Sequence, residues 1–308
     1  MSNIPHETHM ERRDFLKNSA LAASAVTLKW SGAANAAPIP ARPMVKKSLK
    51  WGMVKGDMSI MDKFKMLKEL GYDGVELDSP HDLDHKEILA ARDKTDLELP
   101  GVVNSMHWKS PLSSADPKVR AACVESMKTA LNDCKVYGGT TVLLVPAVVN
   151  AETSYKDAYE RSQAEIRKLI PTAEKTGVKI ALENVWNNFL LSPLEAARYV
   201  DEIDHPLVGW YFDVGNIVRY GWPEHWIEAL DKRIMKLDIK EYSRKKQSDE
   251  GIWKGFQVEI MDGDCNWPAV NQALAKIGYS GWASAEVGGG DRERLAEVSK
   301  RMDRVFAA

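Results

Sequence analysis

The feature that most constrains the fold is an alternation of short apolar runs with amphipathic stretches, which extends from Leu49 almost to the end of the chain. Eight runs have the length and composition of strands, and they cover residues 49–54, 74–78, 101–107, 141–146, 179–184, 208–214, 234–240 and 281–287. Helical patterns lie between them at 61–70, 117–137, 155–176, 193–203, 267–277 and 292–306. Eight strands that alternate with helices over about 260 residues predict an α/β fold, a single-domain (β/α)8 TIM barrel.

Acidic residues occupy the ends of the last four apolar runs, and these residues are Glu183, Asp213, Asp238 and Glu286. The parallel strands of a barrel end on one face, so we expect the four side chains to converge. Repulsion between close carboxylates favours a bound cation. Four oxygen ligands favour Mn²⁺ or Mg²⁺, while Co²⁺ and Zn²⁺ are possible.

Other features surround this cluster. Three basic residues follow the seventh run or lie within it, and we expect them to offset the negative charge: Lys236, Lys240 and Arg244. The stretch 244–264 separates this run from the next helix, and a loop of about 20 residues at that position indicates a functional role. The glycines at 288–290 either cradle a substrate oxygen through backbone N–H groups or form a plain turn.

The composition bears on possible partners. The formal net charge is −2 and the sequence pI is about 6.4, so the chain lacks the basic character typical of nucleic-acid binding. No nucleic-acid partner is expected, and small polar substrates are favoured. The three cysteines have no zinc-site spacing and are interpreted as buried thiols. A homo-oligomer remains possible.

The N-terminus has the features of an export signal. The pair Arg12-Arg13 followed by Asp-Phe-Leu-Lys resembles a twin-arginine signal, and an alanine-rich stretch and the sequence Ala34-Asn35-Ala36 come next. We therefore predict a signal peptide over 1–36, cleavage near Ala36 and a periplasmic location. A linker is expected over 37–47 and the barrel over 48–308. The apolar stretch is too short for stable membrane insertion.

Several short motifs resemble those of the sugar phosphate isomerase/epimerase superfamily, whose members have a xylose-isomerase-like barrel. They are Leu182-Glu183-Asn184, Phe212-Asp213-Val214-Gly215-Asn216, Lys236-Leu237-Asp238-Ile239-Lys240-Glu241, and Gly278-Tyr279-Ser280-Gly281-Trp282 leading into Ala285-Glu286-Val287. Their order and spacing make the resemblance specific from Leu49 to Phe306. The chain departs from the family in having Asp238 where a histidine is usual and Glu241 in place of an aspartate.

The resemblance implies a divalent-metal-dependent sugar isomerase or epimerase. Glu183, Asp213, Asp238 and Glu286 would be the metal ligands. Glu183 and Glu286 would also act as acid and base, transferring protons next to a carbonyl through an enediolate. The substrate would be a small carbohydrate.

The resemblance and the loop positions also indicate substrate-binding candidates, which are His107, Asn216, Lys240 and Arg244. Asn216 falls where ketose epimerases often have a substrate-binding histidine, and Arg244 matches an arginine that contacts substrate in those relatives. His107 is expected at the end of the third strand, in a binding or a structural role. Trp186 and Trp253 fall in loops at the expected active face, where they would contact sugar C–H faces or pack in the core.

Alternative functions remain open. The same site would suit a lyase or hydratase acting on 3-keto-glycosides, or an inosose-type dehydratase. An endonuclease-type hydrolase is disfavoured by the few histidines and the acidic pI. A sugar-binding barrel without catalysis is disfavoured by the presence of both Glu183 and Glu286.

Overall fold

The computed structural model describes residues 44–308. The predicted signal peptide and most of the predicted linker lie outside these residues, so export remains a prediction. Within residues 44–308, no helix has both the length and the apolar character needed to cross a membrane.

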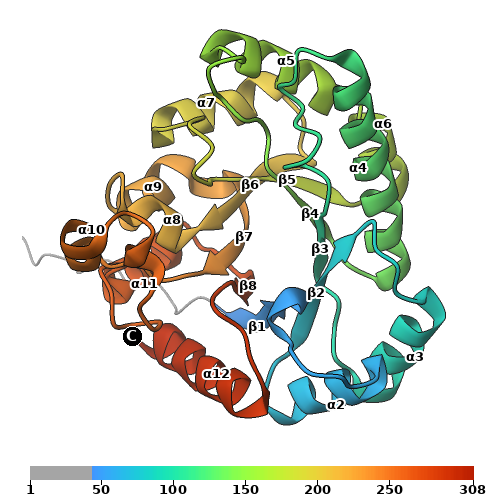
Figure 1. Cartoon of the computed structure of the whole chain (residues 1–308), viewed down its shortest axis with the longest axis vertical. Coiled ribbons are helices and arrows are strands. Elements are labelled where there is room, and N and C mark those ends of the chain that lie inside the picture. The colour runs from blue at the N-terminus through green and yellow to red at the C-terminus, as the bar shows by residue number, and fades with distance from the viewer. Residues whose placement is uncertain (1–43) are drawn as a thin grey trace, which may run out of the picture. The chain divides into compact units, whose positions relative to one another are not determined.

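Eight parallel strands pair in chain order, and the last strand pairs with the first to close a barrel (Figure 1). The strands are β1 (Val45–Lys50), β2 (Gly74–Ser79), β3 (Gly101–Asn104), β4 (Thr141–Leu144), β5 (Lys179–Glu183), β6 (Val208–Asp213), β7 (Ile234–Ile239) and β8 (Gly281–Ala285). The predicted (β/α)8 TIM barrel is therefore confirmed.

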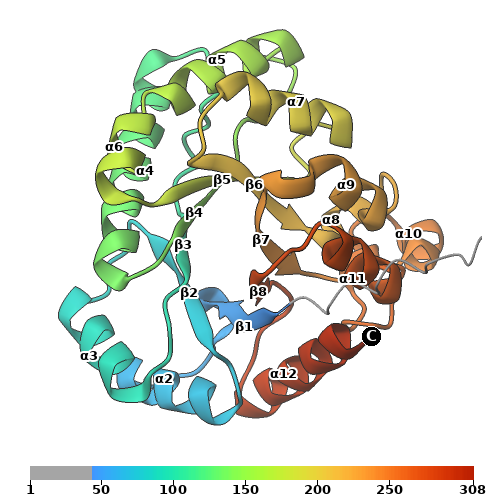
Figure 2. The same cartoon turned by 180° about the vertical axis from the view of Figure 1, so that it is seen from behind.

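Helices surround the strands when the barrel is viewed from either side (Figure 2). The α-helices are α2 (Ile60–Glu69), α3 (His85–Thr95), α4 (Pro117–Tyr137), α5 (Tyr155–Arg167), α6 (Ile170–Thr176), α7 (Pro193–Ile203), α8 (Val214–Val218), α9 (Pro223–Leu230), α10 (Arg244–Glu250), α11 (Trp267–Lys276) and α12 (Arg292–Ala307). The short 3₁₀ turns within residues 44–308 are η1 (Trp51–Met53), η2 (Asp231–Arg233) and η3 (Lys254–Phe256).

Several elements differ from the sequence-based expectation. The first strand begins at Val45, four residues earlier than expected, and ends at Lys50. The helix expected over 155–176 is divided into α5 and α6, because Pro171 lacks an N–H group and crowds the carbonyl of Arg167, where α5 ends. The segment 244–264, expected as a loop, contains α10 and η3.

The main hydrophobic core lies between the barrel and its helices. Outward-facing strand residues such as Leu77, Ile180, Trp210 and Phe212 pack there against buried helix residues such as Leu131. A smaller apolar cluster, Leu143, Ala181 and Tyr211, fills part of the barrel interior. Side chains alternate between these two environments along each strand, as the strand period of two requires.

A polar layer fills another part of the barrel interior. Lys236 forms a buried ion pair with Glu76, which also accepts hydrogen bonds from Tyr211 (2.6 Å) and Ser284 (2.8 Å). A Cβ on Gly101 would lie 2.9 Å from Lys236 Nζ, so a glycine makes room for the lysine. Lys236 was expected to offset the charge of the metal site, but its charge is instead satisfied inside the barrel by Glu76.

Candidate metal centre

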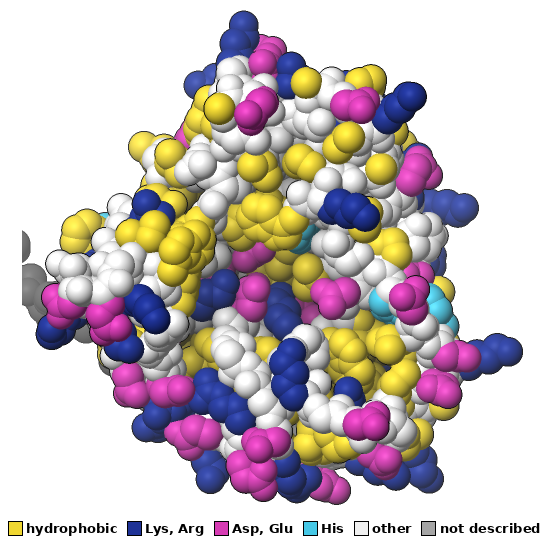
Figure 3. Space-filling model, in the orientation of Figure 1, with side chains coloured by type: hydrophobic (Ala, Val, Ile, Leu, Met, Phe, Trp, Pro, Cys, Tyr) yellow, Lys and Arg dark blue, Asp and Glu magenta, His cyan; other side chains and the backbone are white. Residues whose placement is uncertain are grey.

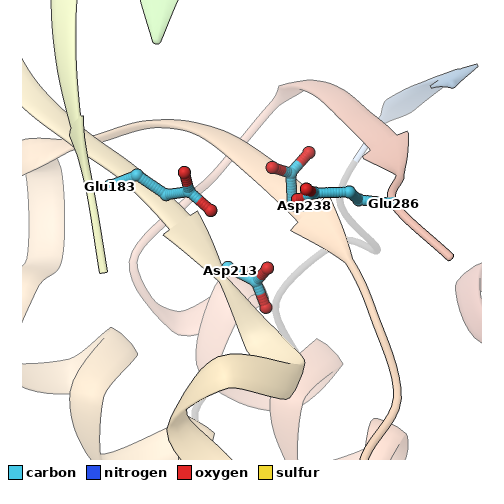
Figure 4. Close-up of side chains that lie close together, drawn as sticks. All are labelled: Glu183, Asp213, Asp238 and Glu286. Carbon is cyan, nitrogen blue, oxygen red and sulfur yellow. The ribbon is translucent and has the colours of Figure 1, made fainter. Parts of the chain in front are cut away.

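The four predicted ligands come from the C-terminal ends of four neighbouring strands. Glu183 and Asp213 are the last residues of β5 and β6, Asp238 is the penultimate residue of β7, and Glu286 follows β8. Asp213 and Asp238 are directly paired in the sheet register. The four carboxylates point toward one another, and one oxygen of each lies within 4.8 Å of those of the others (Figure 4).

The donor set fits a divalent metal ion. Among the described residues, Asp238 Oδ2 is buried without any donor, and three other buried carboxylate oxygens face only lysine ammonium groups: Asp213 Oδ2, Asp238 Oδ1 and Glu286 Oε2. Buried carboxylate oxygens are normally hydrogen-bonded or bound to a cation. An all-oxygen cluster favours a hard cation such as Mn²⁺ or Mg²⁺ over a metal that prefers sulfur or nitrogen ligands.

Two lysines approach the cluster as counter-charges. Lys50 Nζ lies 2.9 Å from Asp238 Oδ1 and 2.8 Å from Glu76 Oε2. Lys240 Nζ lies 2.9 Å from Asp213 Oδ2 and 3.3 Å from Glu286 Oε2. Although burial opposes the effect, these carboxylates raise the pKa of both lysines, so both ammonium groups remain charged.

The carboxylates have unequal environments. Burial, together with repulsion from Glu286 and Asp238, raises the pKa of Glu183 well above its usual value. Burial likewise raises the pKa of Asp238, against the attraction of Lys50. At Glu286, the ammonium groups of Lys240 and Lys50 overcome burial and hold the pKa below its usual value. A bound dication would favour the charged form of every ligand.

A cavity of about 940 Å³ opens above the cluster at the C-terminal mouth of the barrel. Of the predicted site residues, five line it: Glu183, Glu286, His107, Asn216 and Lys240. Asp213 and Asp238 are fully buried. Figure 3 shows a hollow over the middle of the barrel in which hydrophobic, acidic and basic side chains gather.

His107 lines the cavity from a loop, not from the end of a strand as expected, because β3 already ends at Asn104. Its Nδ1 accepts a hydrogen bond from the backbone N–H of Val145 (3.3 Å). Burial lowers the pKa of His107 to about 4, so the ring is neutral at pH 7 and carries its proton on Nε2. His107 can therefore donate a hydrogen bond into the cavity.

Asn216 lies at the cavity floor and is held by several contacts. Its backbone N–H donates to Asp213 Oδ1 (2.8 Å), and its side-chain amide donates to the Asn184 carbonyl (3.0 Å). Its side-chain oxygen accepts a hydrogen bond from Lys240 (3.4 Å). Asn216 therefore orients a metal ligand and Lys240 as well as lining the cavity.

Arg244 does not line the cavity, contrary to the expectation. Its guanidinium donates to the carbonyls of Val218 (3.1 Å) and Gly221 (2.6 Å) and lies over the Trp222 ring. These contacts direct Arg244 toward the link between α8 and α9, outside the lining of the cavity and away from the carboxylates.

Sequence reasoning missed Lys50, Asp78 and Trp108, which also line the cavity. The expected first strand began at residue 49, which placed Lys50 at the wrong end of it. In the observed register Lys50 is the last residue of β1, a position equivalent to those of Glu183 and Asp213. A correct strand boundary would have been enough to identify this lysine.

Residues 64–304 match the family model described as the xylose isomerase-like TIM barrel. The chain belongs to this family. It is 24% identical over 260 residues to the L-ribulose-5-phosphate 3-epimerase UlaE of Escherichia coli, and the match covers 80% of this chain and 89% of the relative.

Solved structures share the same fold. The 3-keto-D-glucoside 4-epimerase YcjR of E. coli superimposes with a TM-score of 0.72 at 16% identity, covering 86% of this chain and all of that one. The D-psicose 3-epimerase of Clostridium cellulolyticum H10 has a TM-score of 0.70 at 17% identity, covering 85% of this chain and 99% of that one. Both of these neighbours are sugar epimerases.

Proposed function

We propose that this protein is a divalent-metal-dependent sugar epimerase or isomerase. The observation that carries the proposal is the convergence of four carboxylates from β5 to β8, two of which, Glu183 and Glu286, also line the cavity. The sugar epimerases among its relatives and structural neighbours support the same reaction class.

Each residue of the centre would have a defined role. Glu183, Asp213, Asp238 and Glu286 would hold the cation, with Mn²⁺ or Mg²⁺ favoured by the oxygen donors. The bound cation would stabilise negative charge that develops on the oxygen of a substrate carbonyl. Lys240 and the Nε2–H group of His107 would donate hydrogen bonds to substrate oxygens.

Glu183 and Glu286 are the proposed acid–base pair. They reach the cavity from β5 and β8, which are three strands apart, so a sugar at the carboxylate cluster would lie between them. One glutamate would remove the proton from the carbon next to the carbonyl, and the other would return a proton to the opposite face. The configuration of that carbon would thereby be inverted.

The test is deuterium exchange in D2O with the Mn²⁺-loaded protein and a panel of ketoses and 3-keto-glycosides. An epimerase incorporates deuterium at the carbon next to the carbonyl and yields an epimer. We expect Glu183→Gln and Glu286→Gln each to slow exchange by about 10²–10⁴-fold, the usual contribution of a general acid or base. Glu160→Gln, on the exposed side of α5, is the matched control.

Two results would contradict the proposal. Full exchange in both glutamine variants would exclude the two-glutamate mechanism. Release of an aglycone without an epimer would indicate the lyase alternative, in which loss of a proton next to the carbonyl is followed by expulsion of the oxygen substituent on the neighbouring carbon.

A further inference from the structure

Two tryptophans line the cavity with much of their surface exposed. Trp253 is 66% exposed and Trp108 is 52% exposed. They follow β7 and β3, which are four strands apart in a closed barrel of eight, so they border the cavity from opposite sides. Large aromatic side chains left open at the rim of a cavity are typical of ligand-binding surfaces.

On the β7 side the exposed tryptophan belongs to an aromatic wall, which we define as Trp186, Trp253 and Phe256. The ring centroid of Trp186 lies 4.9 Å from that of Trp253 and 4.7 Å from that of Phe256. The indole N–H of Trp186 donates to the carbonyl of Asn216 (3.0 Å). The wall therefore starts beside the metal centre and extends outward to Trp253.

The segment that carries Trp253 is held in place before any ligand binds. The single hydroxyl proton of Tyr242 is shared between Gln247 Oε1 (2.8 Å) and the Ile252 carbonyl (2.7 Å), and Ser243 N–H donates to the Gly255 carbonyl (2.8 Å). A preformed aromatic surface binds ligand with little additional ordering cost.

The cavity is larger than one sugar ring would fill. Its volume of about 940 Å³ lies near the upper end of the roughly 300–1,000 Å³ found for sites that bind drug-sized ligands. A single sugar ring at the carboxylates would leave the outer part, bordered by Trp253 and Trp108, unfilled.

The charges in the cavity favour a neutral ligand in this outer part. Among the described residues that line it, the cations are Lys50, Lys55 and Lys240, and none is an arginine. Lys50 and Lys240 contact metal-centre carboxylates, and Lys55 donates to the Gly52 carbonyl. A phosphate group would therefore find no bidentate partner here.

We propose that the substrate is a neutral glycoside. Its ketosugar ring lies at the carboxylate cluster, and its aglycone, a second sugar ring or an aromatic group, stacks on Trp253. This inference rests on the proposed epimerase function and adds the substrate class and the residue that selects it.

The test compares two substrates that share a reacting ring, methyl and phenyl 3-keto-β-D-glucoside, in the Mn²⁺-loaded protein. Deuterium exchange next to the carbonyl gives kcat and KM for each. We expect kcat/KM for the phenyl glucoside to be about tenfold higher, through a lower KM. Trp253→Ala should abolish this preference, whereas Trp253→Phe should retain most of it.

Two further measurements complete the test. Trp222→Ala removes another exposed tryptophan, one that does not line the cavity, and should leave the preference intact. Calorimetric binding of the unreactive phenyl β-D-glucoside should weaken about tenfold in Trp253→Ala.

The outcomes separate the two proposals. Equal kcat/KM for both glucosides, with binding that is indifferent to Trp253, overturns the glycoside inference and leaves the epimerase intact. Absence of exchange with every ketosugar, combined with Trp253-dependent binding of the phenyl glucoside, supports the glycoside site and overturns the proposed reaction.

Discussion

At the residue scale, the cavity contains a histidine whose protonation is set by its surroundings. His107 is 5% exposed, and burial lowers its pKa to about 4. Glu286 raises the pKa and Lys50 lowers it, but neither effect exceeds that of burial. A neutral imidazole suits a hydrogen-bond donor to a sugar oxygen better than a charged one would, because it adds no positive charge beside the proposed cation.

The burial of His107 predicts how the free energy of unfolding depends on pH. In the unfolded chain His107 should titrate near its ordinary pKa of about 6.5, so the unfolded state binds more protons than the folded state between about pH 6.5 and pH 4. Burial of neutral His107 should therefore make the free energy of unfolding fall by about 2.5 kcal/mol between pH 7 and pH 4.5, at about 1.36 kcal/mol per pKa unit.

Urea unfolding at the two pH values measures this effect. His107→Asn should show a pH-dependent loss of stability smaller by that amount, because asparagine does not titrate. The exposed His225 in α9 offers a control, His225→Asn, that should retain the behaviour of the original protein. Identical pH dependence in His107→Asn and the original protein would show that His107 is not held neutral by burial.

At the element scale, the segment between β7 and α11 is fixed at both ends by buried groups. Glu241 accepts hydrogen bonds from the N–H groups of Met261 (2.7 Å), Cys265 (3.1 Å) and the Trp267 indole (2.8 Å). The family resemblance identified Glu241 only as a replacement for an aspartate. In the structure, the glutamate anchors the far end of the segment that carries Trp253.

The end of this segment next to β7 is held by close packing of Gly255 on Tyr242, and this packing gives a second prediction. A Cβ on Gly255 would lie 2.3 Å from the Tyr242 ring, a distance that real side chains essentially never show. Gly255→Ala should therefore displace the segment and reduce stability by about 1–3 kcal/mol. Limited proteolysis should show faster cleavage within 244–264, and calorimetry a lower melting temperature.

Gly221→Ala is the matched control, since the nearest atom to a Cβ there is the Trp226 indole nitrogen at 3.8 Å. If both alanine variants resisted proteolysis equally, close packing of Gly255 on Tyr242 would not be what holds the segment.

Elements with strong end signals were predicted most accurately. The bounds of α4 were predicted at both ends, because Asp116 caps its first turn beside Pro117 and Gly138 ends it in the left-handed conformation. The helix α3 was missed because its pattern is weak: only Ile88 and Ala91 are buried. The start of β1 was missed because Lys46 and Lys47 interrupt its apolar character.

At the scale of the whole molecule, closure of the barrel unites residues that are distant in the chain. Glu183 and Glu286 are 103 positions apart in sequence, yet their carboxylates belong to one cluster. Each of the four successive strands β5 to β8 has one of the carboxylates at its C-terminal end, so a bound ion would link four of the eight strands. Ion binding and global unfolding should therefore be coupled.

The resulting prediction concerns thermal stability. Mn²⁺ at about 100 times its Kd should stabilise the protein by about 2.7 kcal/mol relative to EDTA, which corresponds to roughly 5–10 °C in melting temperature for a domain of this size. Asp238→Asn should lose this response. In EDTA the variant should melt close to the original protein, because burial raises the pKa of Asp238 against the attraction of Lys50, and Lys50 keeps its ion pair with Glu76.

Calorimetry with and without Mn²⁺ gives both quantities, and metal analysis gives the stoichiometry. Asp249→Asn, in α10 and remote from the cluster, should retain the full metal response. A metal-induced rise in melting temperature that survived in Asp238→Asn would place the ion elsewhere.

The amino-acid sequence was enough to predict the eight strands in order, the barrel and the four converging carboxylates, because strand length, helix period and strand-end position are local properties. The partners of the charged side chains were decided by the tertiary structure. Lys50 and Lys240 reach the cluster, whereas Lys236 pairs with Glu76 inside the barrel and Arg244 turns to backbone carbonyls. A long side chain can contact any of several neighbours, and only the closed barrel brings these neighbours together. The face of a strand on which a residue lies does not specify which of them it contacts.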